Sequence, residues 1–255
     1  MTKNEPMVVS ETNLSLAWGR VFLKMLERGI KEISPVLVTI RGFPNGLPAE
    51  REDIRNALDK ELQRPGTRLN CTRVASTIFP LSLWNPEVPR AHLYERYERI
   101  WAHIRRCPAN YRGTYFQRLV LFAENGRRCN QLEHIINVWK AGSPRRSALQ
   151  ASIFDPLRDH SPAPMLGFPC LQHVTFAPIG SNGLCATGFY ATQYIFERAY
   201  GNYLGLCWLG RFMAHEVGLE LAQVNCITGI ALLGKAGKES LVKLKSHVEH
   251  ALSAV

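Results

Sequence analysis

One cysteine in this chain has surroundings that suit chemistry. Cys170 alone among the seven cysteines follows a proline, and the residues after it, LQHVTFA, have the composition of a β-strand. Proline fixes φ of its own residue, so the backbone leading to the thiol is held, and a thiol at a strand end can be presented at a surface. We expect Cys170 to be a nucleophile; the alternative is a small core residue that only packs.

Two further groups have the character of ligand-binding residues. Arg145 and Arg146 are adjacent, and because neighbouring guanidinium groups repel each other, a shared anion would explain the pair. Two solvated charges after a Ser-Pro turn are the alternative. Asn202 follows Gly201 at the start of a strongly apolar segment, where its amide can read the edge of a ligand by donating and accepting hydrogen bonds. Capping a helix is its alternative role, and the two are compatible.

Neutral and aromatic side chains surround these groups. Gln172 lies two residues after Cys170 and therefore on the same face of a strand, where its amide could reach a bound ring; a core or sheet-surface glutamine is the equal alternative. The aromatic lining suits stacking against a flat, weakly charged ring, although aromatic residues at these spacings also fit a plain core. This lining consists of Phe189, Tyr190, Tyr194, Tyr200 and Tyr203, with Gln193 among them.

The elements that position these residues are a mixture of helices and strands. Apolar periodicity predicts helices at 12–28, 93–106, 132–139 and 202–217. Two more are indicated by apolar residues at helical spacing: one on Ile54, Leu58 and Leu62, which stops at Arg-Pro-Gly (64–66), and one on Leu241, Leu244 and Val248. β-branched and alternating patterns predict strands at 35–41, 71–84 with a break at Pro80, 146–154, 171–177, 184–190 and 222–233, and a loop at 110–119. The segment 202–217 is apolar nearly all round, which is typical of a buried helix.

Composition narrows the functional classes. The 255 residues include 31 Lys and Arg against 21 Asp and Glu, a formal net charge of +10, but the arginines of 93–106 fit a solvated helix face and no nucleic-acid-binding module is evident. The sequence has no P-loop, dinucleotide fingerprint, HExxH or GxSxG. Cysteines without a CxxC pair argue against a disulfide framework and a metal site, and we expect most to be buried and reduced.

The sequence gives no membrane or secretion signal. No apolar run reaches the ~18 residues of a membrane span, and the N-terminus lacks the charged-then-apolar order of a secretion signal. We therefore expect a cytoplasmic protein without a membrane partner.

Five segments occur in the order and spacing of a known family. They are NYRGTYFQRL (110–119), QLEHIINVW (131–139), SPRRSALQASIFDPLRD (143–159), FPC (168–170) and GNY (201–203). Over residues 110–234 the chain resembles the thymidylate synthase and pyrimidine hydroxymethylase superfamily, while residues 1–109 are divergent. The resemblance implies a single domain over 1–255 of the α+β class, with a mixed sheet packed with helices around a buried central helix.

This resemblance implies a covalent mechanism. In that superfamily the thiolate after the proline adds to C6 of a pyrimidine, and the resulting enolate attacks a one-carbon unit carried by 5,10-methylenetetrahydrofolate. Such chemistry needs a thiolate of depressed pKa and a hydrogen-bond donor for the charge that develops on the carbonyl oxygen. By resemblance Cys170 is the nucleophile and Asn202 reads the pyrimidine edge.

The resemblance also implies a substrate-binding set and a homodimer. Arg145 and Arg146 match paired arginines that cross a dimer interface to hold the partner's phosphate. Tyr115 and Arg118 fall where a tyrosine and a basic residue flank the substrate cavity. The remaining substrate-binding residues implied are Gln172, Tyr190, Thr192 and Gln193.

Several positions depart from the family pattern. Leu171 stands where a histidine usually follows the nucleophile, and Tyr190-Ala191-Thr192 replaces Gln-Arg-Ser, whose arginine and serine grip phosphate. Tyr194 replaces a folate-contacting aspartate, and residues 231–233 (ALL) replace the His-x-Tyr that holds the sugar. For the essential glutamate the candidates are Glu95 and Glu98. Each lost charge-assisted hydrogen bond is worth roughly 1.5–3 kcal/mol, which argues against ordinary dUMP methylation.

Two hypotheses follow, and a third ranks last. The leading one is a divergent transferase that adds a methyl or hydroxymethyl group to a pyrimidine nucleotide or related heterocycle through a covalent adduct on Cys170. The alternative is a catalytically silent homologue that binds a nucleotide or nucleobase as a sensor or assembly component. A cysteine hydrolase that pairs Cys170 with a distant histidine has no orienting motif behind it.

Overall fold

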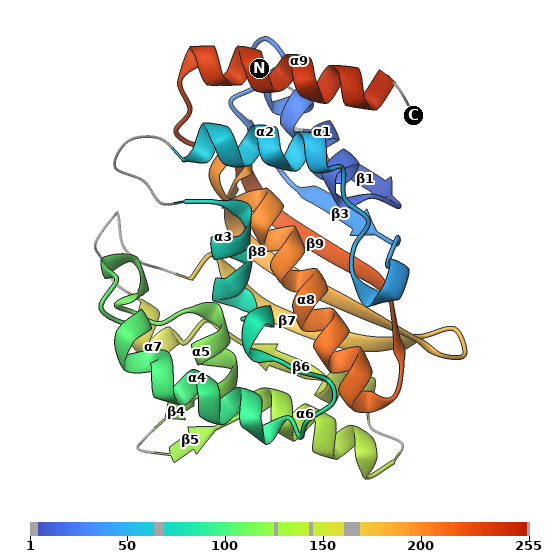
Figure 1. Cartoon of the computed structure of the whole chain (residues 1–255), viewed down its shortest axis with the longest axis vertical. Coiled ribbons are helices and arrows are strands. Elements are labelled where there is room, and N and C mark those ends of the chain that lie inside the picture. The colour runs from blue at the N-terminus through green and yellow to red at the C-terminus, as the bar shows by residue number, and fades with distance from the viewer. Residues whose placement is uncertain (1–4, 64–68, 125–126, 143–144, 161–168, 254–255) are drawn as a thin grey trace.

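A mixed β-sheet organises the protein (Figure 1). The computed structural model describes residues 5–63, 69–124, 127–142, 145–160 and 169–253. Neighbouring strands pair in parallel between β1 and β3 and between β8 and β9, and in antiparallel fashion elsewhere. The order across the sheet is β1 (Met7–Glu11), β3 (Val36–Ile40), β9 (Glu220–Leu232), β8 (Gly183–Tyr194), β7 (Leu171–Ile179) and β6 (Gln150–Ser152), and β2 (Glu32–Ile33) also pairs with β9. The expected α+β class with a mixed sheet is confirmed.

Helix α8 (Tyr200–Val217) is the buried helix that the sequence predicts. Fourteen of its eighteen residues are buried, which explains why its sequence is apolar nearly all round. It packs on β8 and β9 and, on another side, against α3 (Cys71–Ile78). The contact with α3 is close: a Cβ built at Gly201 would lie 2.5 Å from Val74 Cβ, and one at Gly205 would lie 2.8 Å from the Ala75 carbonyl oxygen.

The prediction of a strand over 71–84 is wrong, because residues 71–78 form α3. Its β-branched residues favour a strand locally. The side chain of Asn70, however, caps the helix by accepting from the Arg73 N–H at 2.7 Å. Burial at helical spacing, on Cys71, Val74, Ala75 and Ile78, then packs α3 against α8, so tertiary contact overrides local propensity.

The predicted loop at 110–119 also contains a helix. Residues Tyr115–Val120 form α5, which Thr114 caps by accepting from the Gln117 N–H at 3.1 Å. The strand predicted at 146–154 shortens to β6, because Arg146–Ala148 form a 3-10 turn. Strand β1 has no counterpart among the predicted elements.

The other long elements agree with the sequence pattern apart from their ends. They are α1 (Leu14–Met25), α2 (Glu52–Leu62), α4 (Ala91–Ile104), α6 (Gln131–Lys140) and α9 (Lys238–Ser253). A short α7 (Pro156–Asp159) and a hairpin of β4 (Phe122–Glu124) and β5 (Arg127–Cys129) are not among the predicted elements. The predicted helix stop at 64–66 lies outside the described residues. Figure 1 shows α9 beside α1 and α2 at one end of the molecule and α4, α5 and α6 at the other.

One face of the sheet carries partly exposed apolar side chains. A Cβ at Gly188 would lie 2.8 Å from Leu206 of α8, so Gly188 faces the helix and Phe189 faces away from it. Phe189 pairs in register with Ile227, Ile227 with Leu37, and Leu37 with Val8, which forms an apolar row across four strands. Phe189 is 41% exposed and Val8 is 70% exposed.

Among the described residues, no helix combines the length and the apolar character needed to cross a bilayer.

Candidate functional site

Six of the predicted site residues line one cavity of about 270 Å³. They come from separate segments: α5, the residue before β7, the end of β8 and the first turn of α8. Val74 and Thr77 of α3 also line it. The six residues are Tyr115, Arg118, Cys170, Thr192, Gln193 and Asn202. A sequence spread of almost ninety residues is therefore gathered by the fold around one thiol.

Cys170 is held at the start of β7. Its carbonyl oxygen accepts from the Ala191 N–H at 3.0 Å, which ties the residue to β8. The side chain is half-buried and lines the cavity. Burial raises the pKa of the thiol above its ordinary value, and the positive charge of Arg198 acts in the opposite direction. The expectation of a depressed thiol pKa is therefore not met in the free protein.

Asn202 is 4% exposed and lines the same cavity from α8. The helix follows a π-helical turn at Ile195–Ala199, and its N-cap residue, Ala199, makes no side-chain capping bond. The alternative of a helix-capping asparagine is thus not realised. The amide makes no hydrogen bond to another described residue, so within that part of the chain its donor and acceptor are available to a ligand.

Tyr115 lies close to Cys170. Burial raises the pKa of its hydroxyl, the neighbouring Cys170 raises it further, and the backbone N–H groups of Leu171 and Cys170 act in the opposite direction. The hydroxyl therefore stays protonated at neutral pH and can act as a hydrogen-bond donor at the cavity wall.

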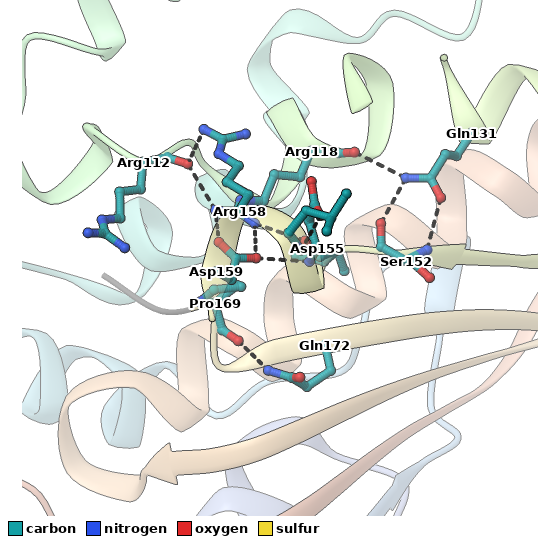
Figure 2. Close-up of polar contacts among 11 residues, drawn as sticks. Arg112, Arg118, Gln131, Ser152, Asp155, Arg158, Asp159, Pro169 and Gln172 are labelled. Carbon is teal, nitrogen blue, oxygen red and sulfur yellow. Dashed lines mark hydrogen bonds and ion pairs between the residues drawn. The ribbon is translucent and has the colours of Figure 1, made fainter. Parts of the chain in front are cut away.

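Arg118 lines the cavity but its charge is already neutralised (Figure 2). Its guanidinium donates to both carboxylate oxygens of Asp159, at 2.5 and 2.8 Å, and also to the backbone oxygens of Ile153 and Arg112. These bonds fix α5 against α7. The guanidinium helps to shape the wall, and a role for it in substrate binding stays a prediction.

Gln193 contributes to the wall with an amide that is already engaged. Its Oε1 accepts from the Thr228 hydroxyl at 3.1 Å, and its Nε2 lies 3.8 Å from Cys226 Sγ. The side chain is 2% exposed. Gln193 is therefore held in one orientation by β9.

The remaining predicted residues lie away from the cavity lining. Gln172 donates from Nε2 to the Pro169 carbonyl oxygen at 2.5 Å and so stiffens the backbone before Cys170 (Figure 2). Tyr190 is fully buried, and its hydroxyl finds no hydrogen-bond partner in the described part of the chain, so it behaves as a core residue. Arg145 and Arg146 are both exposed around the 3-10 turn before β6.

Glu95 and Glu98, the candidates for a catalytic glutamate, do not line the Cys170 cavity. Glu95 and Glu98 lie on the exposed face of α4 and line a different surface hollow, with Arg99. Among the described residues that line the Cys170 cavity there is no aspartate, glutamate or histidine. In that same part of the chain, no group of three His, Cys, Asp or Glu residues could hold a metal ion.

Sequence reasoning missed Arg198 in this cavity. Arg198 lies in the π-helical turn between β8 and α8, eight residues after Tyr190. No motif marks it. Only the turn that reverses the chain from β8 into α8 brings it beside Cys170.

No protein-family model matches the chain, and no curated protein matches its sequence.

Proposed function

We propose that the chain is a divergent thymidylate-synthase-like transferase in which Cys170 adds covalently to a pyrimidine nucleotide or related heterocycle. One observation carries the proposal: Cys170, Asn202 and Tyr115, which the resemblance names for separate roles, line one cavity. Its volume of about 270 Å³ is slightly below the roughly 300–1,000 Å³ of typical ligand sites, and so suits one small ring-containing ligand.

The chemistry assigned to the thiol is a conjugate addition. Sγ of Cys170 forms a bond to the ring carbon, the π electrons of the ring double bond move onto the conjugated carbonyl oxygen, and the thiol proton leaves to water. Asn202 provides an amide that hydrogen bonds the ring edge, and the protonated hydroxyl of Tyr115 is placed to donate to developing negative charge.

The one-carbon donor that the resemblance implies is 5,10-methylenetetrahydrofolate, which would supply carbon at the oxidation level of formaldehyde. Tyr194 suits part of this group, because it lines the cavity while 42% exposed and so presents an aromatic face to a flat pterin. A carboxylate for the pterin nitrogens is absent from the described lining. Whether the product carries a methyl or a hydroxymethyl group depends on what happens to the folate after it has delivered the carbon.

A homodimer is part of the proposal. The apolar row of Phe189, Ile227, Leu37 and Val8 lies on the sheet face that points away from α8. Arg145 and Arg146 are exposed and accessible to a second copy. Both features support self-association through surfaces outside the cavity.

Intact-mass spectrometry tests the covalent step. The protein is incubated with 5-fluorouridine 5′-monophosphate or 5-fluorouridine, with and without methylenetetrahydrofolate. We expect a mass increase equal to the ligand, or to ligand plus folate, that is lost in Cys170→Ser and kept in Cys107→Ser. Cys107 is an exposed cysteine outside the cavity lining and so serves as the matched control.

A catalytically silent binding protein is the second candidate. It is favoured by the raised thiol pKa and by the lack of an aspartate, glutamate or histidine in the described cavity lining. Titration calorimetry with the same two ligands separates the candidates. Saturable heat without any adduct on Cys170 would support the binding protein and contradict the transferase.

A further inference from the structure

Arg198 presents a cation in the cavity that contains Cys170 and Asn202. The residue lies in the π-helical turn at Ile195–Ala199, which connects the end of β8 to α8. Its side chain is exposed as well as lining the cavity, so an incoming ligand can reach the guanidinium.

The charge of Arg198 has no partner among the described residues. Arg118, the other arginine of the cavity, is held by Asp159 at 2.5 and 2.8 Å, whereas no ion pair or hydrogen bond engages the Arg198 side chain in that part of the chain. The adjacent Glu197 is used elsewhere, because its Oε2 accepts from the Lys235 N–H at 2.9 Å.

Acidic groups are also lacking around it. None of the described lining residues is an aspartate or glutamate, and none of residues 1–4, 64–68, 125–126, 143–144, 161–168 and 254–255 is one either. With Arg118 neutralised, Arg198 leaves the described wall with net positive charge. A partly enclosed cationic wall concentrates anions more strongly than an open surface does.

We propose that Arg198 binds an anionic group of the ligand beside Cys170, so that the ligand is a heterocycle carrying a phosphate or a carboxylate. This rests on the proposed function only in taking the Cys170 cavity as the ligand site. From Ala191 and Tyr194 the sequence indicates a loss of charged ligand-binding groups and hence a weakly charged ring. Arg198 revises that expectation, because it places a positive charge in the same cavity although no sequence motif identifies it. The planar guanidinium suits either anion, since it can donate two parallel hydrogen bonds.

Alkylation of Cys170 by two reagents tests whether Arg198 places positive charge beside the thiol. Iodoacetate is anionic and iodoacetamide is neutral, so the ratio of their rate constants reports the potential beside the thiol and is independent of the thiol pKa. At low ionic strength we expect Arg198→Gln to lower the ratio about threefold, Arg198→Lys to retain most of it, and salt to reduce the difference. Arg99→Gln, at an exposed arginine of α4, is the control and leaves it unchanged. An equal ratio in wild type and Arg198→Gln overturns the inference.

Protection of Cys170 against iodoacetamide identifies the anion. The ligands are uridine 5′-monophosphate, orotate, uridine and uracil. Stronger protection by the phosphate or the carboxylate than by the neutral pair, lost in Arg198→Gln, supports the inference and tells the two sources apart; equal protection by charged and neutral ligands contradicts it. The alkylation ratio requires no pyrimidine adduct, so a ratio lowered in Arg198→Gln with no fluoropyrimidine adduct would refute the proposed transferase and leave the anion site standing.

Discussion

Arg118, which lines the Cys170 cavity, forms a buried ion pair with Asp159 through two contacts. Nη1 and Oδ2 lie 2.5 Å apart and Nη2 and Oδ1 lie 2.8 Å apart, with side chains 3% and 1% exposed. The pair joins α5 to α7 across 41 positions of sequence. Each buried charge is neutralised by the other. Removing either charge alone would therefore leave an uncompensated charge in the protein interior.

Asp159→Asn is expected to destabilise the protein by about 3–5 kcal/mol, because the Arg118 guanidinium would stay buried without its counter-ion. The measurement is urea unfolding followed by circular dichroism. Asp53→Asn is the control: Asp53 pairs with Arg51 in a largely exposed ion pair, so the change in unfolding free energy should be small. Equal losses in the two variants would contradict this assignment.

The same carboxylate gives stability a pH dependence. Burial raises the pKa of Asp159, but the hydrogen bonds from Arg118 and from the backbone N–H of Asp155 outweigh it, so the pKa lies below its ordinary value. A carboxyl whose folded pKa is lowered stabilises the protein above the unfolded pKa and loses that contribution as pH falls through the folded value. The difference in unfolding free energy between wild type and Asp159→Asn should therefore begin to shrink as the pH falls below about 4, and should continue to shrink through the lower folded pKa.

The reactivity of Cys170 should rise with pH well beyond neutrality. Burial raises the thiol pKa and Arg198 lowers it, so removing the cation in Arg198→Gln moves the pKa further up. The rate of iodoacetamide alkylation, followed by peptide mass spectrometry between pH 6 and 10, should reach its plateau at higher pH in the variant. A plateau below about pH 8 in wild type would show instead a depressed thiol pKa.

Loss of the hydroxyl should change the free energy of unfolding differently at two buried tyrosines of α8. The hydroxyl of Tyr200 donates to Glu50 Oε2 at 2.8 Å and lies 2.8 Å from Ser15 Oγ, so Tyr200→Phe should cost about 1–2 kcal/mol of unfolding free energy. The hydroxyl of Tyr203 is buried without a partner in the described chain, so Tyr203→Phe should be neutral or stabilising. Chemical unfolding of both variants checks the contrast, which a loss of equal size in each would refute.

Self-association should depend on the apolar row of the sheet. Phe189→Lys places a charge at the β8 end of that row, and we expect a dimer to become a monomer at micromolar concentration in sedimentation velocity. Val242→Lys is the control, since Val242 is 69% exposed on α9 and should leave association unchanged. A wild-type protein that sediments as a monomer at these concentrations would remove the homodimer from the proposal.

Local sequence patterns predict the long helices and strands of this fold, because the pattern of each element depends only on residues within that element. Helix α8 is apolar nearly all round and β7, β8 and β9 have strand-like composition, so the type of each element can be predicted without knowledge of its neighbours. Helix α3 is not, since its β-branched residues favour a strand. It becomes a helix because Asn70 caps it and because Gly201 and Gly205 of α8 leave room for it.

The candidate site divides in the same way. The sequence by itself singles out Cys170 after a proline and Asn202 at the start of a buried helix, since both signals are local. Only the tertiary structure decides that Tyr115 joins them, that Tyr190 turns into the core, that Asp159 neutralises Arg118 and that Arg198 faces the thiol. The physical reason is that the burial of a side chain and the electrostatic potential around it depend on all the groups near it in space. Many of those groups are distant in sequence, so residue spacing along the chain does not predict them.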